Sequence, residues 1–170
     1  MSVDSHDSSL SSYVEVLRRI GARNILEFGT TNAHFCMEIV RTLDWTASVN
    51  LHCVDYGGED FDSELRAASA DSSSDIVVTK HLGSETEVND AIMRAAEQSP
   101  YNAIFISSAS SAEALLTTLM VAHESLAPGG VIGISQLLDS NQSMAPAIDS
   151  FRGMYGDSYE ESTKNIFVKQ

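Results

Sequence analysis

The sequence predicts an α/β fold in which a doubly wound, mostly parallel sheet carries helices on both faces. Short apolar segments rich in Val and Ile alternate along the chain with amphipathic patterns of helical length. The segments around residues 24–29, 101–107 and 130–137 are predominantly apolar, which is typical of parallel strands buried on both faces. With 170 residues and 43% hydrophobic side chains, the chain is sized for one compact domain. One parallel sheet wound by right-handed crossovers follows from this alternation.

The elements follow one another in a regular order. Leu10, Val14 and Leu17 have helical spacing, which predicts a helix over residues 10–20 that ends at Gly21. A buried strand over residues 24–29 then turns through polar residues into a helix over 33–43. The further strands are expected at residues 49–56, 75–81, 101–107 and 130–137, and the further helices at 59–70, 85–98, 112–126 and 144–154.

The end of the chain departs from this order. Residues 158–162 and 165–169 are separated by a short connection, which predicts an antiparallel hairpin. The hairpin brings the sheet to seven strands. We expect residues 1–170 to form a single domain, with residues 1–9 as a polar leader, because no linker or internal repeat interrupts the pattern.

Charge and composition exclude several classes of function. The chain has 24 acidic and 10 basic residues, a formal charge of −14, whereas nucleic-acid binding needs clustered Lys and Arg. The same balance disfavours an anionic membrane surface, and no apolar run approaches the roughly 20 residues needed to span a bilayer. The acidic, Ser-rich start does not have the pattern of a signal peptide. We therefore expect a cytoplasmic protein.

Two cysteines, Cys36 and Cys53, lie within apolar segments and have no partner at metal-ligand spacing. This pattern predicts buried structural thiols in a reducing compartment.

Candidate binding residues lie where the predicted strands end, because ligands of a doubly wound sheet bind beyond the carboxyl ends of its strands. The first strand ends at Glu27 and Phe28, and Gly29 then allows the backbone to approach a ligand. The second strand ends at Asp55, a carboxylate able to hold two vicinal ribose hydroxyls. An ordinary strand-to-helix turn at Gly29 and a solvated strand end at Asp55 stay open as alternatives.

The order of these motifs resembles a known family. Residues 26–30, Asp55, Gly83 with Ser84, residues 101–106 and residues 126–132 look like the successive motifs of class I S-adenosylmethionine-dependent methyltransferases. The small-molecule O-methyltransferase-like group is the most similar. The resemblance spans residues 10–170, and the terminal hairpin is similar to the family's antiparallel sixth and seventh strands.

This resemblance implies S-adenosylmethionine as the cofactor. Glu27 would organise the glycine loop near the methionine amino group, and Gly29 and its neighbours would face the methionyl part. Asp55 would take the ribose, Tyr56 would flank the adenine, and residues 83–84 would lie at the adenine edge. The residues expected around the cofactor are Glu27, Gly29, Thr30, Asn32, Asp55, Tyr56, Gly83, Ser84 and Ser107.

The sequence also departs from the family. Thr31 and Ala33 stand where further glycines are common, and Ser107 and Ser135 stand at strand ends where metal-dependent members carry acidic ligands. Because hydroxyls are poor substitutes for carboxylates around a hard divalent cation, we expect no catalytic metal. Residues 128–130 are interpreted as a turn after a helix.

No catalytic residue is nominated. His34, His81 and His123 have no partner in the sequence that makes any of them a general base.

Two functions are consistent with these observations. The first is an S-adenosylmethionine-binding, methyltransferase-like protein that transfers the methyl group to a small-molecule acceptor without metal. The alternative is a catalytically inactive subunit of the same fold that serves binding or interaction, since glycines and acidic positions are missing at three strand ends. A nicotinamide dehydrogenase is disfavoured, because residues 29–33 do not supply its glycine pattern. The acceptor, any protein partner and a homo-oligomeric state stay open.

Overall fold

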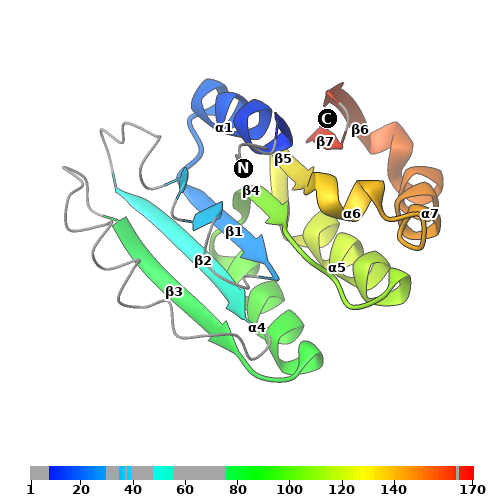
Figure 1. Ribbon diagram of the computed structural model, residues 1–170. Helices are drawn as coiled ribbons and strands as arrows, with labels where there is room; N and C mark the ends of the chain where they lie inside the picture. The colour runs from blue at the N-terminus through cyan, green and yellow to red at the C-terminus, as the bar shows by residue number, and fades with distance from the viewer. Residues whose placement is uncertain (1–7, 30–34, 37, 40–47, 56–75, 164) are drawn as a thin grey trace, which may run out of the picture.

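The computed structural model describes residues 8–29, 35–36, 38–39, 48–55, 76–163 and 165–170. They form one sheet of seven strands in the order β3-β2-β1-β4-β5-β7-β6 (Figure 1). The strands are β1 Asn24–Phe28, β2 Val49–Asp55, β3 Ile76–Leu82, β4 Tyr101–Ile106, β5 Leu126–Ile134, β6 Tyr159–Thr163 and β7 Ile166–Lys169. The helices are α1 Ser8–Ile20, α4 Glu85–Gln98, α5 Ala112–Ser125, α6 Gln136–Ser140 and α7 Ala145–Tyr155, followed by a 3₁₀ turn at Gly156–Ser158.

The sheet confirms the predicted class and topology. Strands β1 to β5 pair in parallel, whereas β7 runs antiparallel to both β5 and β6. The chain builds outward from β1 to β2 and β3, then crosses to the other side of β1 for β4 and β5. The strand order therefore reverses between β1 and β4, which is where ligands bind in doubly wound folds.

Side chains of each strand alternate between the two faces of the sheet, and each face is covered by a hydrophobic core. Ile25 faces a core that includes Tyr13 and Leu17 of α1, whereas Leu26 faces a core with residues of α4, α5 and α7. Figure 1 shows α1 on one side of the sheet and α4 and α5 on the other. Helix α1 lies close over β5, because a Cβ at Gly133 would stand only 2.6 Å from the Tyr13 ring.

The start of β5 differs from the prediction. The structure ends α5 at Ser125, where Leu126 turns to extended backbone (φ −85°, ψ 131°), and β5 begins at once rather than at residue 130. Lys169 Nζ explains this early end, since it donates hydrogen bonds to the carbonyls of His123 (2.7 Å) and Leu126 (3.0 Å). The glycines at 129 and 130 therefore do not terminate the helix. They lie in an irregularity of β5, where the register with β4 shifts.

The end of β5 also differs. The strand was expected to reach residue 137 but stops at Ile134. The Ser135 hydroxyl instead accepts a hydrogen bond from the Leu138 N–H and caps the short α6.

Two predicted helices lie wholly or partly outside the described residues. Residues 35–36 and 38–39 are helical, in agreement with the helix expected over 33–43. The helix expected over 59–70 falls outside the description.

Across the ranges given above, no helix combines the length and the apolar character that crossing a membrane requires.

Candidate functional site

The ends of β1, β4 and β5 meet at the carboxyl edge of the sheet. The Ser107 N–H donates to the Phe28 carbonyl at 2.9 Å, and the Ser135 N–H donates to the Ile106 carbonyl at 3.0 Å. These bonds continue the parallel ladder past the strands, so the loops after β1, β4 and β5 start close together. This edge holds three of the predicted site residues, Glu27, Gly29 and Ser107.

Glu27 is a buried carboxylate at this edge, with only 2% of its surface exposed. Its Oε1 accepts a hydrogen bond from the Ser107 hydroxyl at 2.5 Å, and its Oε2 accepts one from the Cys36 thiol at 2.8 Å. Ionised acceptors make the stronger hydrogen bonds in proteins. Glu27 therefore joins β1 to the start of the loop after β4 and to the helical residues that follow β1.

Gly29 owes its conformation to a contact within the chain. Its φ is +79°, and an added Cβ would lie 2.6 Å from the Ser108 carbonyl oxygen and 2.9 Å from the Ser108 nitrogen. The Ser108 hydroxyl also donates to the Gly29 carbonyl at 2.9 Å. The Ser108 contact explains why this turn needs a glycine, and the approach of a ligand to Gly29 stays a prediction.

Ser107 was predicted to face the cofactor. The structure shows its hydroxyl on Glu27, while its carbonyl accepts from the Ser135 hydroxyl at 2.9 Å. Both serines thus link the strand ends to one another, and a role toward a ligand stays a prediction.

Gly83 and Ser84 follow β3, two strands away from β1. Gly83 is exposed with φ +141°. Ser84 is the N-cap of α4 in a capping box with Glu87: the Ser84 hydroxyl and N–H both donate to Glu87 Oε2, at 2.7 and 3.0 Å. These bonds lower the pKa of the Glu87 carboxyl. Ser84 thus has a structural task, and its predicted place at the adenine edge stays untested.

Four other predicted residues are not described at the level of their side chains. Asp55 ends β2 in register with Leu82, which places its backbone between the Glu27 strand and Gly83, but its side chain is not described. Thr30, Asn32 and Tyr56 lie outside the described residues.

The two cysteines have partners that sequence spacing did not predict. Cys36 and Cys53 are free thiols, both fully buried, with their Sγ atoms 2.8 Å apart. Burial raises the pKa of the Cys36 thiol, and Cys53 and the charge of Glu27 raise it further. The prediction of buried thiols is confirmed, and the contact between them comes from the fold rather than from their spacing in the sequence.

A second polar group lies on the opposite face of the sheet, across β2, β3 and β4. His52 Nδ1 lies 3.0 Å from His81 Nε2 and 3.3 Å from the Tyr101 hydroxyl. Burial, with a smaller contribution from His81, lowers the pKa of His52 to about 4. Burial also lowers the pKa of His81 and raises that of Tyr101 to about 12. All three groups are therefore neutral at pH 7.

This group makes the free energy of unfolding depend on pH. Between about pH 6.5 and 4 the unfolded chain protonates His52 and the folded chain does not, so stability falls as the pH falls through this window. Because the ring is partly exposed, we expect a loss of roughly 1–2 kcal/mol. Urea unfolding at pH 7 and pH 4.5 should show a smaller loss for His52→Gln than for the wild type. An equal loss in both proteins would contradict this assignment.

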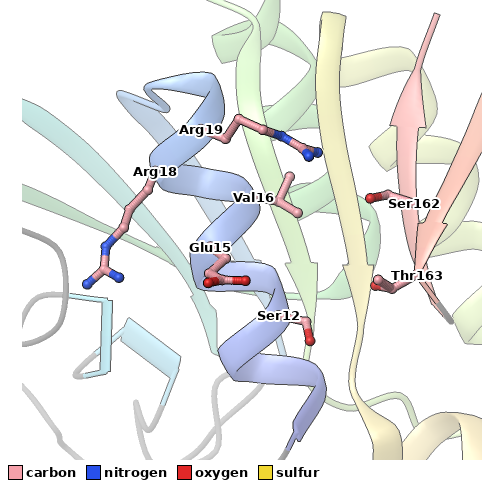
Figure 2. A pocket seen from close by; sticks show the side chains of 7 residues that line it. All are labelled: Ser12, Glu15, Val16, Arg18, Arg19, Ser162 and Thr163. Atoms are coloured by element: carbon pink, nitrogen blue, oxygen red, sulfur yellow. The ribbon is translucent and has the colours of Figure 1, made fainter.

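A groove of about 570 Å³ lies elsewhere, between α1 and the β6–β7 hairpin. Figure 2 shows Arg19 of α1 pointing toward Ser162 and Thr163, and Arg18 pointing away from them. None of the predicted site residues lines this groove.

Comparison with known proteins identifies the fold. No protein-family model and no curated protein matches the sequence. Among solved structures, the O-methyltransferase of Bacillus cereus in complex with SAH has a TM-score of 0.64 at 18% identity, covering 100% of this chain and 84% of that one. The O-methyltransferase TomG of Streptomyces achromogenes, involved in tomaymycin synthesis and in complex with SAM, has a TM-score of 0.58 at 15% identity. The match covers 98% of this chain and 89% of that one.

A further match is the precorrin-6y C5,15-methyltransferase of Geobacter metallireducens, with a TM-score of 0.59 at 11% identity, covering 94% of this chain and 76% of that one. The chain therefore has the Rossmann-like fold of class I S-adenosylmethionine-dependent methyltransferases.

Proposed function

We propose that the chain binds S-adenosylmethionine at the carboxyl edge of β1, β2 and β3 and transfers its methyl group to a small-molecule acceptor. The observation that carries this proposal is Glu27, a buried carboxylate at the end of β1, beside the point where the strand order reverses. Two structures of the same fold, from B. cereus and S. achromogenes, hold SAH and SAM.

The residues present fit this cofactor at Glu27. Its carboxylate already accepts hydrogen bonds from a hydroxyl and a thiol, so this position is built to receive donors, as an ammonium group requires. Gly29 contributes the turn that follows. Asp55 is the acceptor for the ribose hydroxyls, and the exposed Gly83 with Ser84 borders the adenine.

The chemistry requires positioning more than acid–base help. The bound cofactor supplies a methyl group on a sulfonium: the carbon–sulfur bond breaks as a bond forms to the acceptor nucleophile, which loses a proton to solvent. The chain orients the two reactants in line, an effect that supplies much of the rate of such reactions. Glu27 is held in place for this role, because it is buried and its two carboxylate oxygens accept hydrogen bonds from Ser107 and Cys36.

The acceptor is a small, non-nucleic-acid molecule, since the charge of −14 opposes binding to phosphate backbones. The two free buried thiols support a cytoplasmic location.

Asp55→Ala is expected to weaken SAH binding about 10- to 100-fold, because the lost hydrogen bonds to a charged group contribute roughly 1.5–3 kcal/mol. Isothermal titration calorimetry of the purified proteins with SAH measures this change. Asp157→Ala, at an exposed turn before β6, is the matched control and should bind as the wild type does. Equal affinities for wild type and Asp55→Ala would refute the ribose assignment, and a wild type that binds neither SAH nor SAM would refute the function.

A further inference from the structure

Glu27, Cys36 and Cys53 form a buried cluster at one face of the sheet. One ligand atom from each lies within 4.8 Å of the ligand atoms of the other two. We propose that this Glu27–Cys36–Cys53 cluster is a binding site for a thiophilic divalent cation of the Zn²⁺ class. The site is distinct in chemistry from a magnesium-type catalytic site. It shares Glu27 with the cofactor site proposed above, but its test needs no cofactor.

The fold itself brings the three residues together. Glu27 on β1 and Cys53 on β2 are register partners in the parallel ladder, so their side chains leave the same face of adjacent strands. Cys36 lies in the helical residues above this face, and its thiol contacts both Glu27 Oε2 and Cys53 Sγ at 2.8 Å. Three separate segments of the chain thus converge on one point.

The donor set selects the ion. Thiolate sulfur favours soft or borderline ions such as Zn²⁺ over Mg²⁺ and Ca²⁺, which prefer oxygen. With Zn–S bonds of about 2.3 Å, tetrahedral zinc holds two sulfurs roughly 3.8 Å apart. The two thiols therefore separate by about 1 Å on binding, a change within reach of small side-chain rotations. Two sulfurs and one carboxylate leave the fourth tetrahedral position for water.

Ser107 is not one of the three proposed ligands, but it orients the Glu27 carboxylate. Its hydroxyl donates to Glu27 Oε1 at 2.5 Å, whereas the Cys36 thiol lies against Oε2. One carboxylate oxygen is thereby held by a hydrogen bond while the other faces the sulfurs. Outer hydrogen bonds of this kind orient metal-binding carboxylates in known sites.

The hydrogen bond between Cys36 and Glu27 favours a cation over oxidation of the cysteines. Binding replaces two thiol protons by one divalent ion and releases both protons, so the cluster carries a net charge of about −1 before and after. A disulfide would need a two-electron oxidant and would leave the same net charge, but it removes the S–H that Cys36 donates to Glu27. A buried carboxylate oxygen that loses a donor is costly, whereas a bound cation keeps all three groups partnered.

Cobalt titration of the whole chain tests the proposal. The protein is purified under reducing conditions, stripped with a chelator, and titrated with Co²⁺ in the absence of SAH. We expect about one equivalent to bind, with the intense near-ultraviolet absorption of cobalt–thiolate bonds, and Zn²⁺ to abolish this absorption by displacement. Because no SAH is present, the result is independent of whether the chain binds S-adenosylmethionine.

Variants assign the ligands. Cys36→Ser and Cys53→Ser should each reduce the thiolate absorption and weaken Co²⁺ binding at least tenfold, and Glu27→Gln should weaken it while keeping the absorption. Ser107→Ala should weaken it by about tenfold through the carboxylate. His52→Gln is the matched control. It removes one imidazole of the His52–His81 pair on the opposite face of the sheet and should leave Co²⁺ binding at the cluster unchanged.

The wild-type titration decides the matter even where a variant fails to fold. No thiolate absorption, or a mass two hydrogens lower that shows a disulfide in the reduced preparation, would overturn the proposal. Absorption that persists in both cysteine variants, or binding that His52→Gln abolishes, would overturn it as well.

Discussion

Phe105→Ala is expected to lower the free energy of unfolding by about 3–5 kcal/mol. The Phe105 ring is 3% exposed and stacks on Phe35 with ring centroids 4.2 Å apart and planes within 8°. It also lies 5.1 Å from the Tyr13 ring of α1. The ring thus joins β4, α1 and the helical residues after β1, and its removal leaves a cavity that three elements share.

Guanidinium unfolding followed by circular dichroism measures the change. Phe105→Leu keeps much of the buried volume and should lose about half as much. Val77→Ala, on the 53% exposed Val77 of β3, is the surface control and should stay within about 0.5 kcal/mol of the wild type. A loss below about 1 kcal/mol for Phe105→Ala would show that this aromatic group does not hold the layers together.

Gly29→Ala is expected to cost about 2–4 kcal/mol. Part of this loss of stability is the strain of a side chain at φ +79°, and the rest is the steric contact of the new methyl group with the Ser108 backbone. The new methyl also meets the Ser108 hydroxyl, which can rotate away, but the Ser108 carbonyl oxygen and nitrogen belong to the main chain, so side-chain rotation does not relieve those two contacts.

Gly21→Ala separates the two causes. Gly21 has nearly the same conformation, φ +63°, but nothing lies within 4 Å of its added Cβ. It should lose only about 1 kcal/mol, which is the backbone cost alone. Chemical unfolding of both variants measures the difference, and equal losses would mean that Ser108 yields to the methyl group.

Local sequence patterns predicted an element well where the residues that set its ends lie beside it in the sequence. Residues 85–98 form a helix as expected, because Ser84 and Glu87 cap its start and an apolar stripe runs along it. The start of β5 escaped prediction because a distant group sets it, whereas its end escaped because a local cap interrupts an apolar segment. Lys169 ends α5 from the far end of the sequence, and Ser135 caps a new helix where the apolar run continues.

From the sequence, the residues of the candidate site could be predicted only where they lie at the end of a predicted strand. Glu27 and Gly29 were found because they close a strand, but their partners Ser107 and Ser108 follow another strand almost 80 residues later. The Ser84–Glu87 spacing is itself a capping-box signal, readable before any ligand role. The Cys53 contact depends on the register of β1 with β2, which no short-range pattern encodes.

The position of β7 between β5 and β6 has a consequence for synthesis on the ribosome. Strand β6 is made first, yet in this sheet it pairs only with β7. Until residues 166–169 emerge, β5 presents an open edge that includes the apolar Val131 and Ile132. Translation covers the interval in on the order of a second, during which that edge is available to other strands. A domain inserted between β6 and β7 would lengthen this interval, so such fusions should depend on chaperones more than insertions between α4 and β4.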